Sequence, residues 1–446
     1  MKFLPILLLL ASAFGQMNTG EVSGQVTDIS GAAMPGATVV AEQSQTGQKF
    51  QTVSNAAGQY LFPQLPIGSY SLRAAAQSFK QSTIPSITVH IGETLRYNFT
   101  LQVGDANEAV VVEADPGEVQ LQTAEIKDVF PPRDVVGLPL KGRQFLDLAM
   151  LSEGVVRPPG GTRGDSMQQA GTLVNVLGQR SGHNLYLVDG ATVTDEHFNN
   201  MVIAPSIESI GEFNIQKTSY APEFGGKSGA VINVVTKSGS NAVHGSLFEF
   251  VRNDRFDAKN YFDSASAAIP PFRQNQFGTG VGGPIVRNKT FFFVSYEGQR
   301  IRKSLTQTFS VPSVALRSGD FLGQPTIYDA SRTPYPLNRI PATRLDPVAS
   351  ALLGTVPLPN LPGLSQNLRA SERQRVNNNN YSGRLDHQFS PSDTTYARFS
   401  LFDARQFDPF GSGVLQESLL PGFGRNLSTH SLNGVVGWTH VFTPQV

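Results

Sequence analysis

The chain has 446 residues, with 35 Lys and Arg against 35 Asp and Glu, so its formal net charge is zero. This balance excludes a strongly basic surface, and we expect no nucleic-acid partner. The sequence has no cysteine, which excludes disulfide frameworks, thiolate nucleophiles and Cys-ligated metal sites. Its 43 Gly and 29 Pro favour turns and strands over long helices.

Residues 1–15 predict a secretory signal peptide. Met1 and Lys2 give a positive start, Phe3 to Leu10 form an apolar run, and small residues follow up to Gly15. The alternative is the start of a buried helix, but the small residues stand where a signal peptidase cleaves. We therefore expect an exported chain, and the absence of cysteine suits a bacterial envelope.

Residues 20–103 predict a small all-β domain, because short apolar runs recur at roughly the 8 to 12 residue spacing of a sandwich. Gly and Pro residues between the runs mark turns. The expected strands are Glu21–Val26, Thr38–Ala41, Gln59–Phe62, Ser69–Ala74, Ile87–His90 and Arg96–Leu101.

Several motifs in this region stand in the order found in one known family. They are Gly24-Gln-Val-Thr-Asp28, Pro35-Gly-Ala-Thr-Val39, Gly58-Gln-Tyr60, Leu65-Pro-Ile-Gly-Ser-Tyr70 and Phe79. Together they resemble the carboxypeptidase regulatory-like domain. The resemblance implies a seven-stranded, transthyretin-like β-sandwich with a carbohydrate-binding-like fold, and it does not imply a peptidase.

Residues 104–118 form a linker with one extended apolar element, in which two acidic residues flank three consecutive valines. Such a segment is β-prone and can add itself to the sheet edge of another protein. The alternative, a last strand of the preceding sandwich or a spacer, has equal weight. The residues of this element are Glu108, Ala109, Val110, Val111, Val112, Glu113 and Ala114.

Residues 119–240 combine a helical pattern with strand patterns. We expect a short helix at Gln144–Leu151 and a glycine-rich loop at residues 158–169. The expected strands are Asn184–Val188, Gly211–Gln216 and Gly229–Thr236.

Residues 241–446 predict strands whose apolar and polar residues alternate with period two. The connections between these strands alternate between long and short, as they do between the two rims of an outer-membrane barrel. The alternative is a large soluble sheet, which has no reason for this alternation. We expect six strands, near residues 243–252, 274–286, 289–301, 379–389, 394–404 and 430–442.

A second resemblance spans the chain from about residue 20 to its end, and its motifs are dense. They are Leu138–Phe145, Leu185–Gly190, Tyr220–Gly226, Ser228–Gly239, Asn275–Gly278, Gly282–Ile285, Phe291–Phe293 and Tyr296–Gly298. The chain resembles the TonB-dependent outer-membrane receptors, in particular the Oar-like branch that carries an N-terminal regulatory-like domain.

The resemblance implies a mostly β chain with a periplasmic sandwich, an α/β plug at residues 119–240 and the first strands of a transmembrane antiparallel β-barrel at residues 241–446. It implies a place in the outer membrane, in contact with lipid, and uptake of a large substrate energised by TonB. Glu108 to Ala114 is then the place where this chain holds a TonB box, which pairs with TonB by strand addition. The substrate class stays open between carbohydrate, siderophore, peptide and protein.

Six strands are too few to close such a barrel, and open edges in lipid leave backbone groups unpaired. We therefore expect the sequence to be the N-terminal part of a longer receptor. Two alternatives remain. One is an envelope, carbohydrate-binding or adhesion protein that uses the sandwich, where Tyr60, Phe62, Tyr70 and Phe79 could stack on sugars if exposed, although most of them should be core. The other is a non-functional truncated receptor.

No enzyme, cofactor or metal site is expected. Gly278-Thr-Gly-Val-Gly-Gly283 matches a dinucleotide fingerprint but lies in strand-like sequence. The seven histidines lack metal-ligand spacing, and Asp195-Glu-His197 is typical of a solvated loop. Arg163-Gly-Asp165 is treated as a coincidence in a polar loop.

Overall fold

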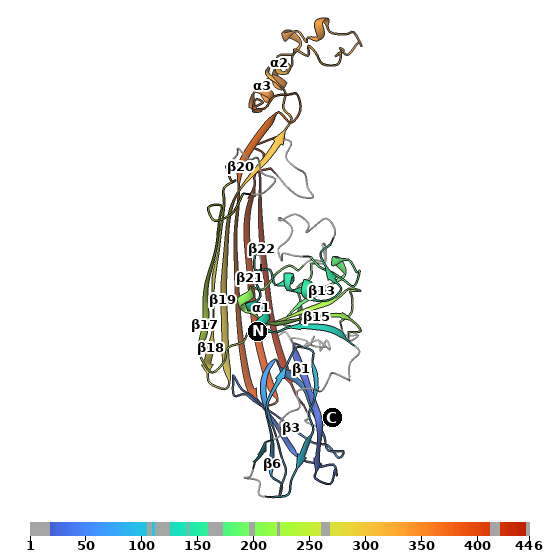
Figure 1. Ribbon diagram of the computed structural model, residues 1–446, viewed down its shortest axis with the longest axis vertical. Helices are drawn as coiled ribbons and strands as arrows, with labels where there is room; N and C mark the ends of the chain where they lie inside the picture. Colours follow the sequence, from blue (N-terminus) through green and yellow to red (C-terminus); the bar gives the residue numbers. More distant parts are fainter. Residues whose placement is uncertain are drawn as a thin grey trace, which may run out of the picture.

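The computed structural model describes residues 18–104, 109–111, 125–140, 142–158, 173–195, 201–220, 224–259, 268–410 and 420–442. These residues form a β-sandwich, a small α/β unit, here called the plug, and one tall curved sheet, here called the wall (Figure 1). The expected mostly β fold class is confirmed. The expected signal peptide lies outside the described residues, and the expected domain boundaries stay predictions.

The first sheet of the sandwich is built around β1 (Thr19–Asp28), which pairs antiparallel with β4 (Gln59–Pro66). On its other side β1 pairs in parallel with β7 (Thr94–Arg96) and then with β8 (Phe99–Leu101). Between these two short strands, Asn98 Oδ1 accepts a hydrogen bond from the Gln25 amide at 3.0 Å and interrupts the ladder. Counted as one interrupted strand, β7 and β8 bring the strands between Thr19 and Leu101 to the expected seven, and β9, described next, adds an eighth.

The second sheet has the order β3 (Lys49–Val53), β2 (Thr38–Gln43), β5 (Gly68–Ala75), β6 (Gln81–Val89) and β9 (Ala109–Val111). β3 is absent from the expected strands because Phe50 is the one large apolar side chain on its inner face. Between the two sheets lies an apolar core that contains Tyr60, Phe62 and Tyr70. These rings are buried and therefore offer no exposed platform for a sugar.

The plug is a five-stranded sheet in the order β10 (Ile126–Phe130), β15 (Ile210–Thr218), β16 (Val231–Thr236), β13 (Leu185–Val188) and β14 (Ala191–Thr192). Its three expected strands correspond to β13, β15 and β16. The expected helix is the 3₁₀-helix η1 (Phe145–Leu151), whose Phe145 packs on Phe213 of β15 with ring centroids 5.3 Å apart. The smaller elements are α1 (Pro132–Gly137), β11 (Val155–Val156), β12 (Asn175–Val176), η2 (Ser181–His183) and η3 (Ile207–Ser209).

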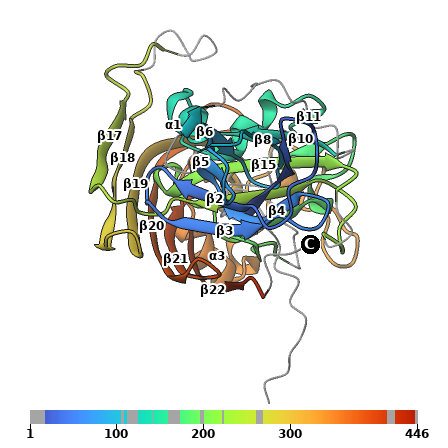
Figure 2. The same cartoon turned by 90° about the horizontal axis from the view of Figure 1, so that it is seen from below.

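The wall is a sheet of six strands paired in chain order, each antiparallel to the next. Its strands are β17 (His244–Asn253), β18 (Phe272–Val286), β19 (Thr290–Phe309), β20 (Leu368–Ser390), β21 (Asp393–Asp408) and β22 (Arg425–His440). The number of strands and the alternation of short and long connections are as expected. Among the described residues β17 and β22 form the two edges, so the sheet is open. The plug lies beside its concave face and the sandwich lies below both (Figures 1 and 2).

The connection between β19 and β20 is an ordered head at the far end of the wall (Figure 1). It contains α2 (Val314–Arg317), η4 (Pro336–Asn338), η5 (Ala342–Arg344) and α3 (Pro347–Thr355). The Asp346 carboxylate caps α3 by accepting hydrogen bonds from the amides of Val348 and Ala349. The Arg317 guanidinium donates to the carbonyls of Leu353, Val356 and Pro357 at the other end of α3. No helix of the described residues is long and apolar enough to cross a lipid bilayer.

Replacing Arg317 by Ala is expected to loosen the head, because three carbonyls at the end of α3 lose their donor. Limited chymotrypsin digestion of the chain in detergent should then cut the head several-fold faster than in the wild type. Arg332→Ala, an exposed arginine of the same head, is the matched control and should leave the rate unchanged. Equal rates for the two variants would show that Arg317 does not hold α3.

Candidate functional site

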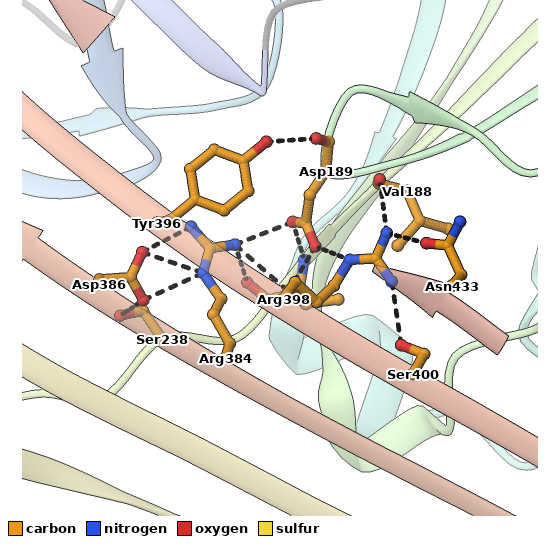
Figure 3. Close-up of polar contacts among 10 residues, drawn as sticks. Val188, Asp189, Ser238, Arg384, Asp386, Tyr396, Arg398, Ser400 and Asn433 are labelled. Atoms are coloured by element: carbon orange, nitrogen blue, oxygen red, sulfur yellow. Dashed lines mark hydrogen bonds and ion pairs between the residues drawn. The ribbon is translucent and has the colours of Figure 1, made fainter. Parts of the chain in front are cut away.

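A buried carboxylate joins the plug to the wall. Asp189 follows the buried strand β13, and its side chain has no exposed area. Its Oδ1 lies 2.8 Å from Nη1 of Arg384 on β20, and its Oδ2 lies 2.8 Å from Nε of Arg398 on β21 (Figure 3). The Asp189 backbone has a φ of 48°, a left-handed conformation that aspartate tolerates better than most residues. The turn Asp189-Gly190 thus aims one plug carboxylate at two wall arginines.

Further polar groups complete the Asp189 cluster. Thr236 of β16 donates its amide to Asp189 Oδ1 at 2.9 Å and its hydroxyl to Oδ2 at 2.7 Å. The Tyr396 hydroxyl donates to the Asp189 carbonyl at 2.6 Å. Arg384 also pairs with Asp386 at 2.8 Å, and Asp386 accepts from Ser238 of the plug at 2.6 Å (Figure 3). Two arginines therefore face two aspartates, and the buried charges balance.

A second ionic cluster lies at Arg143, which ends the Leu-Pro-Leu-Lys-Gly-Arg motif of the plug. Arg143 Nη2 donates to Glu208 of the plug at 2.9 Å, and its Nε lies 3.9 Å from Glu297 of β19. Its guanidinium also lies 4.1 Å from the ring centroid of Phe248 on β17. Glu208 in turn accepts from Ser246 of the wall at 2.7 Å. As at Asp189, ion pairs and hydrogen bonds of charged side chains join the plug to the wall.

A small polar cavity of about 100 Å³ adjoins Arg143. Ser206 Oγ, which lines it, is buried and has no hydrogen-bond partner among the described residues. A cavity of this size and polarity suits a few ordered water molecules. The wall side chains that line it are Gln276, Glu297, Gln299, Asn378, Asn380 and Phe402. The seam between plug and wall is thus polar and has room for solvent.

The predicted TonB-interaction element is described only in part. Glu108, Val112, Glu113 and Ala114 lie outside the described residues, while Ala109–Val111 form β9. β9 pairs in parallel with Gln81–Thr83 of β6, so the segment is the last strand of the sandwich sheet. Its other edge has no strand partner in the described part of the chain. The pairing agrees with one of the two alternatives, and binding of a partner at the free edge stays a prediction.

One sequence motif that matches a known kind of site, the glycine-rich run at residues 278–283, is fully described. Gly278–Gly283 lies inside β18, without the helix that a dinucleotide site needs. The described residues contain no group of three or more side chains that could hold a metal ion. Arg163–Asp165 and Glu196–His197 lie outside the described residues.

The sequence analysis did not single out the charged residues of the two clusters. Asp189 and Arg143 were included there only within motifs, and Arg384 and Arg398 only within the expected strands near residues 379–389 and 394–404. Two features of the sequence could have indicated the Asp189 cluster. One is the Asp-Gly turn directly after a buried strand, and the other is an arginine in each of two neighbouring expected strands, which pair as Arg384 and Arg398. Which acid meets which base depends on how the plug sits against the wall, and local patterns do not contain this.

Comparisons with known proteins agree with the two resemblances. Residues 235–446 match the family described as outer membrane beta barrel domain, and residues 21–102 match the carboxypeptidase regulatory-like domain. The chain is 31% identical to the TonB-dependent transporter Oar of Myxococcus xanthus over 328 residues, which are 70% of this chain and 29% of the relative. The chain thus spans less than a third of that relative's length.

Two solved structures are also similar to the chain. The outer membrane transporter YddB from Escherichia coli aligns with a TM-score of 0.44 and 12% identity, over 71% of this chain and 37% of that one. The siderophore receptor PirA from Acinetobacter baumannii aligns with a TM-score of 0.34 and 15% identity, over 68% of this chain and 43% of that one.

Replacing Asp189 by Asn is expected to destabilise the packing of the plug by about 3 to 5 kcal/mol, because the buried Arg398 loses its counter-charge and Arg384 keeps only Asp386. The free energy of unfolding, from urea titration of the chain in detergent, checks this. Asp403→Asn removes a partly exposed carboxylate near Arg405 and His430 on the same wall and should cost about 1 kcal/mol or less. Similar costs for the two variants would contradict a special role of the Asp189 cluster.

Proposed function

We propose that this chain, an Oar-like homologue of the TonB-dependent outer-membrane receptors, takes part in TonB-driven uptake of a large substrate. It lies in the outer membrane, with its sandwich on the periplasmic side. In the proposed mechanism the wall belongs to a barrel, the plug obstructs the lumen, and tension transmitted from TonB displaces the plug. Transport, and not catalysis, is the activity that we assign.

The observation that supports this proposal best is that, among the described residues, the plug and the wall share no apolar core and are joined by polar contacts. The large apolar core of the plug contains only residues between Phe130 and Val234, so it includes no side chain of the wall. The described contacts around Asp189 and Arg143 that join the plug to the wall are ion pairs, hydrogen bonds and the stacking of the Arg143 guanidinium on the Phe248 ring. Water replaces such contacts at modest cost, whereas it cannot replace a shared apolar core. A plug of this kind can move past the wall while its own core stays closed.

We further propose that Glu108 to Ala114 is the segment that binds TonB. The backbone of β9 already forms a strand, and one of its edges is free within the described residues. An edge strand offers a row of unpaired amides and carbonyls to a strand of another protein. Because the segment contains the last strand of the sandwich sheet and the chain runs on from it to β10, the first strand of the plug, tension on it reaches both units.

The alternative function, carbohydrate binding by the sandwich, has less support. Its strongest sequence argument was the aromatic set Tyr60, Phe62 and Tyr70, and all three side chains are buried. Phe79 is only partly buried, but it packs against the same core. The substrate of the proposed transport is not assigned, and carbohydrate, siderophore, peptide and protein all remain as classes.

The double change Val110→Pro and Val111→Pro tests the TonB segment. Successive amides of a strand point to opposite edges, so this variant loses a donor on each edge of β9. We expect the affinity for the periplasmic domain of TonB, measured by calorimetry, to fall at least tenfold. The control, Val110→Ala with Val111→Ala, keeps both donors and should bind within about threefold of the wild type. Unchanged binding by the proline variant would refute the assignment.

A further inference from the structure

The plug sheet has two faces of opposite character, and both are buried. On β15, Phe213 and Ile215 point into the apolar core of the plug. The alternate residues Glu212, Asn214 and Gln216 are polar, yet they are also buried. A polar sheet face normally meets water, so its burial calls for a cover. Figure 2 shows the sandwich strands lying over the plug from this side.

The cover is attached through one turn of the sandwich, between β6 and β7. The amide of Ile91 donates to Glu212 Oε1, and the His90 ring nitrogen Nδ1 lies 2.9 Å from Glu212 Oε2. Asn214 donates its side-chain amide to the Ile91 carbonyl at 3.2 Å, and Lys127 of β10 donates to the Gly92 carbonyl. We call His90, Ile91 and Gly92, with these partners, the plug foot.

A second attachment joins the sandwich to the wall, and its described contacts involve backbone groups and uncharged side chains. The backbone amide of Asn241 donates to the Gln45 carbonyl at 3.0 Å, and its side chain donates to the Thr46 carbonyl at 2.6 Å. Gln388 of β20 donates to the Lys49 carbonyl at 3.2 Å. We call these contacts the wall foot. The sandwich is thus attached at two places: the plug foot includes charged side chains, and the wall foot is formed by backbone groups and amide side chains.

We propose that the sandwich is a detachable cap on the polar face of the plug sheet, and that the plug foot opens while the sandwich itself stays folded. Three observations carry this. The covered face is polar, so water can solvate it after opening. Asn214 Oδ1 and Gln216 Oε1 are buried without a hydrogen-bond partner among the described residues, so hydration satisfies groups that docking leaves unpaired. The sandwich also has an apolar core of its own, formed by residues between Val22 and Leu101.

The plug foot also responds to pH. The hydrogen bond to Glu212 raises the pKa of His90, the charges of Glu212 and Glu93 act in the same sense, and burial and Lys127 oppose them. The docked state therefore binds the His90 proton more tightly than the open state. This contribution is complete below the ordinary histidine pKa of about 6.5 and is lost as the pH rises through the raised pKa. The wall foot has no such group among its described contacts.

One consequence rests on the proposed function, while the cap itself does not. The chain runs from β9 of the sandwich sheet to β10 through residues 112–125, and Lys127 of β10 belongs to the plug foot. Tension on the proposed TonB segment therefore acts next to a contact that closes the cap. We therefore expect the plug foot to open first and the plug to be displaced afterwards.

The amide of Ile91 is a direct reporter of opening, because it donates to Glu212 across the interface. In hydrogen-exchange mass spectrometry of the full chain in detergent, this amide should exchange faster than the amides that join β2 to β5. Glu212→Gln removes the charge and should raise the Ile91 rate about tenfold, with β2 and β5 unchanged. Glu42→Gln, a carboxylate on the sandwich surface near Lys49 and Arg73, should leave every rate unchanged.

Two results would overturn the proposal. One is an Ile91 amide that exchanges only as slowly as the β2–β5 amides in the wild type, since the cap then opens only by unfolding. The other is a Glu212→Gln variant whose Ile91 rate does not rise, or rises only together with the β2–β5 rates. Neither readout involves TonB, so a failed TonB-binding experiment leaves this proposal standing, and the reverse also holds.

A pH series provides an independent check. After correction for intrinsic exchange, the Ile91 rate should be lowest below about pH 6.5 and should rise as the pH increases through the raised pKa of His90. His90→Gln keeps a side-chain donor near Glu212 but cannot titrate, so its corrected rate should not change with pH. A wild-type profile as flat as that of His90→Gln would show that His90 does not control the plug foot.

Discussion

The arrangement of the plug against the wall depends on one buried carboxylate. Asp189 holds Arg384 and Arg398 together, and without it two guanidinium groups would face each other in a place from which water is largely excluded. A pair of this kind adds little net stability compared with an apolar contact of equal size. It does impose a unique position, because only one placement of the plug satisfies both arginines, Thr236 and Tyr396 at once. The position of the plug is therefore specific, while the ion pairs and hydrogen bonds that hold it can be replaced by contacts with water.

The contacts within each unit differ in character from the contacts between units. Apolar cores lie within the sandwich and within the plug, and each contains residues of its own unit only. Polar contacts lie between units: Asp189 and Arg143 at the wall, Glu212 at the sandwich. Breaking an apolar core exposes surface at roughly 25 cal/mol per Å², whereas opening a polar seam exchanges one set of hydrogen bonds for another. In the proposed mechanism the units therefore move relative to one another before any of them unfolds.

Much of the architecture followed from the sequence, because strand periodicity and turn residues are local properties. The six wall strands were expected within a few residues for most of their ends, and the main deviation was the extra length of β19 and β20 toward the head. That extension was missed because polar residues such as Arg302 and Arg375 dominate it and hide the alternation. β3 was missed for the same reason, and η1 formed where a helix was expected, although with 3₁₀ geometry.

The sites between units were beyond the reach of local patterns. Nothing near Glu212 in the sequence indicates that its partners are His90 and Ile91, more than 120 residues earlier. What the sequence does contain is the anomaly that these partners resolve: a strand with apolar residues on one face and a carboxylate and two amides on the other, in a unit small enough to bury both faces. A polar face on a buried strand indicates that another unit covers it. Because water can solvate such a face, that unit can detach. In this chain the cover is the sandwich, which meets the polar face of the plug sheet through His90, Ile91 and Gly92.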